Sequence, residues 1–142
     1  MFTGFIRGFN LASGAVGASA AWDTSNLIVV GADEADMALC INRVRELQGG
    51  VVVCRGGEVV EELALPVLGI ISDLTMQDLA EKIAAITRVI KRLGVTLPDP
   101  LLTMATLTGA AIPFLRISEN GLVDFKTGVT KGVVVPDRMY DN

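Results

Sequence analysis

Residues 51–63 have the sequence VVVCRGGEVVEEL, in which two valine-rich runs flank the dipeptide Gly56-Gly57. A Gly-Gly pair between two such runs is typical of a tight β-hairpin turn, because the central residues of that turn need positive φ. The stretch therefore predicts two antiparallel strands. A second hairpin is predicted where Leu115-Arg116-Ile117 and Leu122-Val123-Asp124 flank Glu119-Asn120-Gly121, since Asn-Gly favours the same turn.

Four further short segments predict strands. Residues 4–9 and 14–21 are too short and too rich in glycine for helices, and their small residues suit close packing against another layer. Residues 27–30 are apolar throughout, which predicts a central strand covered on both faces. Residues 133–135, three valines, are expected to form an edge strand near the end of the chain.

Two segments have the apolar periodicity of helices. The stripe of the first helix, which Gly49-Gly50 should end, consists of Met37, Cys40, Ile41, Val44 and Leu47. The second helix has Thr75 as its predicted N-cap, with Asp78 in the capping-box position and Leu74 placed to pack on Leu79. Gly94 is its expected stop, and its buried face should consist of Leu79, Ile83, Ile86, Ile90 and Leu93.

Hairpins that alternate with single helices predict an α+β fold. We expect one domain over residues 1–142, with a largely antiparallel sheet of about six strands covered by helices. A parallel α/β sheet is the alternative, because the fully apolar strand before the first helix would suit it.

Composition excludes several classes of function. The net charge is −4, from 12 basic and 16 acidic residues, which argues against a nucleic-acid partner. The longest uncharged stretch, residues 100–115, is interrupted by Pro, Gly and Thr, so we expect no membrane-spanning helix. The first residues contain no basic segment followed by a long apolar run, so we expect no secretory signal either. The chain has no histidine, which excludes histidine-ligated metal centres and the Ser-His-Asp and Cys-His nucleophile systems.

Ordinary structural roles are predicted for most charged residues and for both cysteines. Acids suit the start of the first helix and bases the end of the second, where they oppose the helix dipole; these residues are Asp33, Glu34 and Asp36, and Arg88, Lys91 and Arg92. The hairpin acids Glu58, Glu61 and Glu62 are expected to be solvated. Cys40 and Cys54 are expected to be buried free thiols, which suits a reducing cytoplasm.

Two features remain as functional candidates. The loop Trp22-Asp23-Thr24-Ser25-Asn26 contains the only tryptophan of the sequence and four hydrogen-bonding side chains, which suit a binding site. The alternative is a purely structural role, because Asn and Asp also cap turns. The uncharged stretch 100–115 carries seven large apolar residues, which either belong to the core or are buried by another domain or subunit.

The order of short motifs along the chain resembles the C-terminal domain of bacterial and archaeal adenine deaminases. The resemblance covers residues 4–135 and includes Gly4-Phe5-Ile6-Arg7-Gly8-Phe9, Asn26-Leu27-Ile28-Val29-Val30-Gly31, Leu65-Pro66-Val67-Leu68-Gly69, Leu97-Pro98-Asp99-Pro100 and Gly121-Leu122-Val123-Asp124. It implies that the chain is part of an amidohydrolase that hydrolyses adenine to hypoxanthine and ammonia. The family's divalent metal centre lies in a barrel domain that precedes the matched region, so we expect no metal or other cofactor in this chain.

One departure from the family bears on activity. Family members commonly have His-Asp-Ser-His-Asn where this chain has Trp22-Asp23-Thr24-Ser25-Asn26, so Asp23 and Asn26 match while both histidines are replaced. An indole in place of an imidazole removes an acceptor and any affinity for metal. We therefore expect the chain to be inactive by itself.

Three hypotheses follow. The chain is an accessory domain that packs on an amidohydrolase barrel, or a purine-binding module, or a self-associating structural protein that buries the 100–115 surface between like subunits. In the second, Trp22 would stack on the base while Asp23, Ser25 and Asn26 read its edge.

Overall fold

The computed structural model describes residues 2–21, 26–109 and 114–132. The elements in chain order are β1 Ala15–Ala18, β2 Ile28–Gly31, α1 Glu34–Glu46, β3 Gly50–Arg55, β4 Glu58–Ala64, α2 Met76–Arg92, α3 Pro100–Thr106, β5 Leu115–Ser118, β6 Gly121–Asp124 and β7 Val129–Lys131. All named strand pairs are antiparallel, in a four-stranded sheet of order β2-β1-β3-β4 and a three-stranded sheet of order β5-β6-β7. The predicted α+β class is confirmed, with the strands divided between two sheets.

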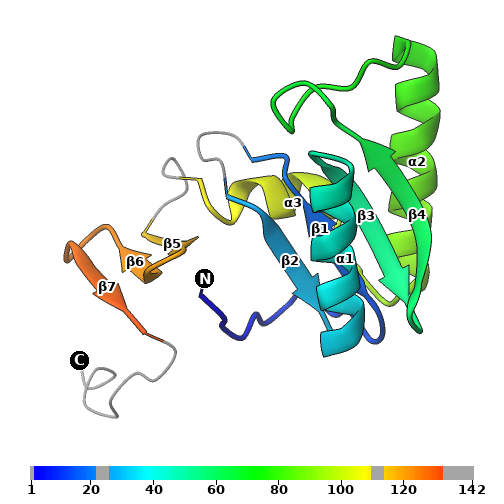
Figure 1. The fold of residues 1–142 in the computed structure, drawn as a ribbon. Helices are drawn as coiled ribbons and strands as arrows, with labels where there is room; N and C mark the ends of the chain where they lie inside the picture. Colours follow the sequence, from blue (N-terminus) through cyan, green and yellow to red (C-terminus); the bar gives the residue numbers. More distant parts are fainter. Residues whose placement is uncertain (1, 22–25, 110–113, 133–142) are drawn as a thin grey trace.

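Helices cover both faces of the four-stranded sheet (Figure 1). Successive side chains of a strand point to opposite faces. Val52 and Cys54 therefore pack with Cys40 and Val44 of α1. Val51 and Val53 belong to the larger core on the other face, which also contains Ile86 and Ile90 of α2 and Met104 of α3.

The predicted hairpin at Gly56-Gly57 is confirmed as the β3–β4 connection, and both glycines have positive φ. Asp36 in the first turn of α1 is 2% exposed, and its carboxylate accepts hydrogen bonds from the backbone N–H groups of Gly56 (2.9 Å) and Gly57 (2.8 Å). Asp33 caps the same helix by accepting from the N–H of Asp36. Asp33 and Asp36 thus have structural roles, as predicted.

We expect Asp36→Ala to lower the free energy of unfolding by about 2 kcal/mol, because it leaves two N–H groups without their charged acceptor. Urea denaturation of the purified variant measures this loss. Glu34→Ala is the matched control, since Glu34 is exposed in the same helical turn, and it should change stability by less than about 0.5 kcal/mol. Equal losses in the two variants would contradict the role given to Asp36.

The second helix begins as predicted. Thr75 accepts a hydrogen bond from the N–H of Asp78 and donates its hydroxyl proton to the Asp78 carboxylate. Ile86 and Ile90 are fully buried, whereas Ile83 is 40% exposed, so the prediction was wrong for Ile83. The neighbouring parts of this half of α2 do contact the sheet, since Leu79 packs against the larger core and Lys82 bonds Glu61 of β4, so helical phase alone does not determine which side chain is buried.

Other strand predictions need correction. The β2 strand lies at an edge of the four-stranded sheet and is not central, because an apolar run does not specify the order of the strands. Residues 4–9 form no strand, and within them Phe5 is fully exposed while Phe9 is buried. Residues 133–135 lie outside the described residues. No helix in the described part of the chain has the length and apolar character needed to cross a membrane.

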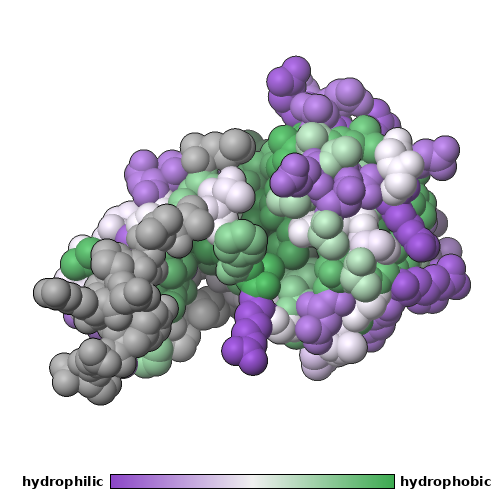
Figure 2. Space-filling view, turned by 90° about the horizontal axis from the view of Figure 1, so that it is seen from below, coloured by the Kyte–Doolittle hydropathy of each residue, from purple (hydrophilic) through white to green (hydrophobic). Residues whose placement is uncertain are grey.

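Figure 2 views the molecule from below, toward the end at which a turn connects β3 and β4. Polar and apolar residues are unevenly distributed on this face. Hydrophilic residues line much of the outer edge of this face, and apolar residues gather toward its middle. The hairpin turn itself is exposed at Arg55, Gly56 and Gly57. Asn26, the described residue of the predicted binding loop, lies near the start of β2, at the opposite end of the sheet.

Candidate functional site

The predicted binding loop begins and ends at one end of the four-stranded sheet. Trp22, Asp23 and Ser25 lie outside the described residues, so their predicted role as substrate-binding residues stays a prediction. Asn26 is described, is half-buried and lies two residues before the start of β2. Because the sheet is antiparallel, β1 and β4 end where β2 and β3 begin, at the upper end in Figure 1.

Ser19 joins three segments at this end of the sheet. Its hydroxyl accepts a hydrogen bond from the N–H of Gly50 at 2.8 Å and donates one to the carbonyl of Gly69 at 2.6 Å. Its own N–H donates to the carbonyl of Gly50 at 3.0 Å. One side chain thus links the end of β1, the start of β3 and the loop after β4.

Gly49 allows these segments to approach closely. Its φ is +128°, and a Cβ placed there would lie 2.4 Å from the Cα of Gly69 and 2.9 Å from the carbonyl oxygen of Leu65. Its carbonyl accepts a hydrogen bond from the N–H of Leu65 at 2.9 Å. The sequence predicted Gly49-Gly50 only as a helix stop and did not indicate this contact, whose partners lie about twenty residues away in sequence.

The loop from Leu65 to Thr75 exposes a cluster of large apolar side chains. Val67 and Ile71 close it with a pair of backbone hydrogen bonds of 3.1 and 3.2 Å. Leu68 has φ +56° and is 86% exposed. Sequence reasoning used this segment only as part of the family resemblance, and its apolar run carried no periodic signal that would show which residues are exposed.

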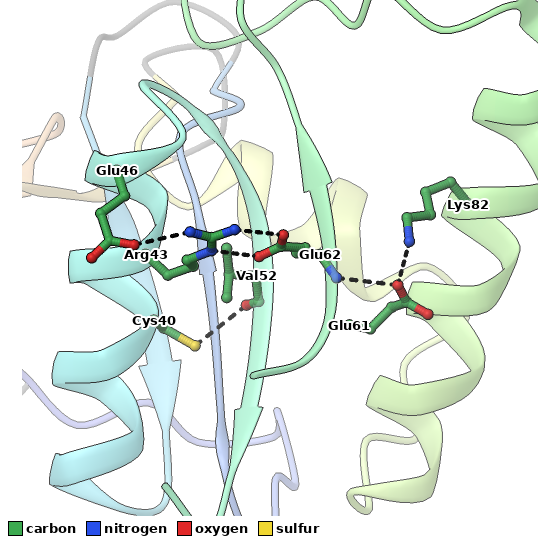
Figure 3. Close-up of polar contacts among 7 residues, drawn as sticks. All are labelled: Cys40, Arg43, Glu46, Val52, Glu61, Glu62 and Lys82. Atoms are coloured by element: carbon green, nitrogen blue, oxygen red, sulfur yellow. Dashed lines mark hydrogen bonds and ion pairs between the residues drawn. The ribbon is translucent and has the colours of Figure 1, made fainter. Parts of the chain in front are cut away.

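Ion pairs attach the edge strand β4 to helices on both sides (Figure 3). Glu62 forms a two-point contact with Arg43 of α1, at 2.7 and 2.8 Å, and Arg43 also contacts Glu46 at 3.0 Å. On the other face Glu61 accepts from the Lys82 ammonium of α2 at 2.6 Å. Glu61 and Glu62 are half-buried, so the prediction that they are solvated was wrong, whereas Glu58 is exposed as predicted.

These contacts keep both carboxylates ionised. The hydrogen bond from Lys82 lowers the pKa of Glu61, and that from Arg43 lowers the pKa of Glu62. Hydrogen bonding to Glu62 in turn raises the pKa of Arg43. A general acid near neutral pH needs the opposite shift, so the geometry favours a structural role for both acids.

The Glu62 pair predicts how stability depends on pH. A carboxyl group whose pKa is lowered by folding stabilises the native state above its ordinary pKa of 4.5, and this stabilisation is lost as the pH falls through the native value. We expect Glu62→Gln to be less stable than the native chain at about pH 6, and the difference to shrink below about pH 4.5. Urea denaturation across this range measures it. In an Arg43→Met background the same change should have little pH dependence, and a full dependence there would contradict the pairing.

Burial makes the thiols of the two cysteines unreactive. Cys40 and Cys54 are fully buried free thiols on the α1 face of the sheet, as predicted. The thiol of Cys40 donates weakly to the carbonyl of Val52 at 3.4 Å (Figure 3). Burial raises the pKa of both thiols, so both stay protonated and unreactive at neutral pH.

The described part of the uncharged stretch 100–115 is divided between core and surface, since Met104, Leu101 and Leu107 pack in or on the core while Leu102, Phe114 and Leu115 are about half exposed. Asp99 caps α3 by accepting from the N–H of Leu102, and Met104 is buried in the larger core. Leu101 and Leu107 pack against that core, whereas Leu102 is 46% exposed. Residues 110–113 lie outside the residues that the structure describes.

Comparison with known proteins identifies relatives that match most of the chain. The family model described as adenine deaminase C-terminal domain matches residues 1–128. The adenine deaminase of Methylobacterium sp. (strain 4-46) is 48% identical over 124 residues, which cover 87% of this chain and 22% of that protein. The adenine deaminase of the archaeon Methanococcoides burtonii is 40% identical over 122 residues, with 86% and 21% covered. The chain thus spans about a fifth of the length of these curated relatives.

Proposed function

Because this chain belongs to the adenine deaminase C-terminal domain family, we propose that it serves as the accessory, non-catalytic domain of an adenine deaminase. In this role it packs on a metal-binding barrel and supports the hydrolysis of adenine to hypoxanthine and ammonia. The proposal rests on the match of residues 1–128 to the family model, together with matches to adenine deaminases of which this chain covers only about a fifth. Free thiols suit a reducing compartment, so we place this role in the cytoplasm.

The donor groups of this chain do not fit a divalent metal centre that generates hydroxide. Such a centre uses imidazole and carboxylate ligands with open positions for water. The chain has no histidine, and its two thiols are buried and protonated. The carboxylates of Glu61 and Glu62 form ion pairs with Lys82 and Arg43. In the residues that the structure describes, no three His, Cys, Asp or Glu side chains form a group that could hold a metal ion. The proposal therefore assigns the metal to the rest of the enzyme.

A fusion protein tests this proposal. The Methylobacterium relative is truncated before its matched 124 residues, and this chain is joined in their place. We expect the truncated relative to lose most of its adenine deaminase activity, and the fusion to form a single folded species by gel filtration. If the truncated relative is as active as the intact enzyme, or if the fused chain stays an independently tumbling domain, the proposal fails.

The same fusion tests the departure at the candidate loop. We expect the fusion with Trp22→His and Ser25→His to form hypoxanthine faster than the unmodified fusion by about tenfold or more. The reason is that the double change restores the two imidazoles that the family has at these positions. The matched control, Thr24→Ala in the same loop, should leave the rate nearly unchanged.

A further inference from the structure

Resting on the proposed function, we propose that the loop after β4 is the surface by which this domain docks onto the rest of the deaminase. The docking residues are six large apolar side chains, here called the loop patch. They are Val67, Leu68, Ile70, Ile71, Leu74 and Met76.

The loop patch is unusual in its density of exposed apolar side chains. Leu68 and Met76 are 86% and 83% exposed, and the other four members are between 43% and 52% exposed. All six lie within ten consecutive residues. Isolated exposed apolar residues are common on proteins, but six of them within ten consecutive residues favour an interaction surface.

The loop is held in one conformation before any partner arrives. The backbone hydrogen bonds between Val67 and Ile71 close it into a turn, and Ser19 anchors it to the sheet through the Gly69 carbonyl. Leu68 adopts φ +56°, a left-handed conformation that costs a leucine about 1–2 kcal/mol, and it points almost its whole side chain to solvent. A strained, exposed leucine on an anchored loop gains nothing from the domain's own core. A preorganised surface loses little entropy on docking.

Charge around the loop patch argues against a second copy of this chain as its occupant. From Leu63 to Glu81 the sequence contains three acidic residues and no basic one, and the groove beside Leu74 adds Glu61, Lys82 and Arg88, so acidic side chains outnumber basic ones around the patch. Three of these acids, Asp73, Asp78 and Glu81, are exposed. A two-fold contact between copies would bring the same acidic edge against itself, which is unfavourable. The surface instead fits an apolar partner edged by basic side chains.

The position of the loop patch favours the remainder of the deaminase as its binding partner. In the relatives, about four fifths of the protein lies outside the part matched here. The loop patch lies at the same end of the sheet as Asn26, the described residue of the predicted binding loop. Ser19, which follows β1 and precedes the predicted binding loop in sequence, donates a hydrogen bond to Gly69 in the loop after β4. Docking through the loop patch would bring this end of the sheet, with the predicted binding loop, toward the barrel.

Hydrogen exchange on the free chain and on the Methylobacterium fusion tests the docking surface. We expect the amides of residues 67–76 to exchange at least about tenfold more slowly in the fusion than in the free chain. Leu68→Asp with Ile71→Asp should abolish this slowing and separate the fused domain, as measured by its independent melting. Leu102→Asp is the matched control, because Leu102 is an exposed leucine on α3, outside the loop patch, and it should leave the fusion unchanged.

The possible outcomes separate the two proposals. Slower exchange elsewhere on the domain, with unchanged exchange at residues 67–76, would overturn the docking surface while leaving the proposed function standing. No slowing anywhere in the fusion would overturn both. Slowing at residues 67–76 that increases with the concentration of the free chain would show self-association through the loop patch and overturn the assignment of its occupant.

Discussion

Replacing Gly49 with alanine is expected to lower the free energy of unfolding by about 3–5 kcal/mol, because two costs combine at this position. The residue has φ +128°, which strains any residue with a side chain. The new Cβ would also lie 2.4 Å from the Cα of Gly69, so the loop after β4 must shift away from the sheet. That shift would strain the hydrogen bond between Ser19 and the Gly69 carbonyl.

Gly56→Ala is the matched control for this prediction. Gly56 also has positive φ, at +63°, but a Cβ there meets no atom within 4 Å. Its cost should be limited to the backbone strain, about 1 kcal/mol. Urea denaturation of both variants gives the comparison, and similar losses for the two would show that the close approach at Gly49 does not contribute.

Ile90→Ala is expected to cost about 3 kcal/mol of folding free energy, since truncating a fully buried isoleucine loses its burial and leaves a cavity. Ile90 belongs to the core between α2 and the sheet, with Val51, Val53 and Met104. Thermal and urea denaturation should both show the loss. A cost below about 1 kcal/mol would mean that α2 does not pack as described.

Ile83→Ala is the control for this second prediction, because it makes the same chemical change on the same helix. Ile83 is 40% exposed, and alanine is the better helix former, so stability should change by less than about 1 kcal/mol. The periodicity of the sequence places Ile83 and Ile90 on one face, and only the structure separates them. A cost equal to that of Ile90→Ala would contradict the position of α2.

Local signals in the sequence predicted the elements of the fold well. The two hairpins, the Thr75 cap and the acidic start of α1 depend on signals within a few residues, and each is confirmed. Four of the five residues of the α1 stripe also pack as predicted. Strand order is a long-range property, so the apolar run of β2 could not show that this strand lies at an edge. The burial of Glu61 and Glu62 likewise depends on Arg43 and Lys82, which lie about twenty residues away in sequence.

The candidate site was predictable only in part. Asn26 is at the predicted loop, but the junction of Ser19, Gly49 and Gly69 was not predicted, because it joins residues up to 50 positions apart. The exposure of Leu68 was also not predictable, since an apolar residue in a loop gives no periodic signal. The glycine pattern was the one usable sign: close approach of two chain segments requires residues without a Cβ.

The central claim is that the chain is catalytically dependent on the rest of a deaminase, and adenine turnover by the purified 142-residue chain tests it most directly. Hypoxanthine release should be measured with Mn²⁺, Fe²⁺ or Zn²⁺ supplied, against a buffer blank. We predict a rate indistinguishable from the blank with each metal. Hypoxanthine release that rises in proportion to the concentration of the chain, and that elutes with it through successive columns, would contradict the account.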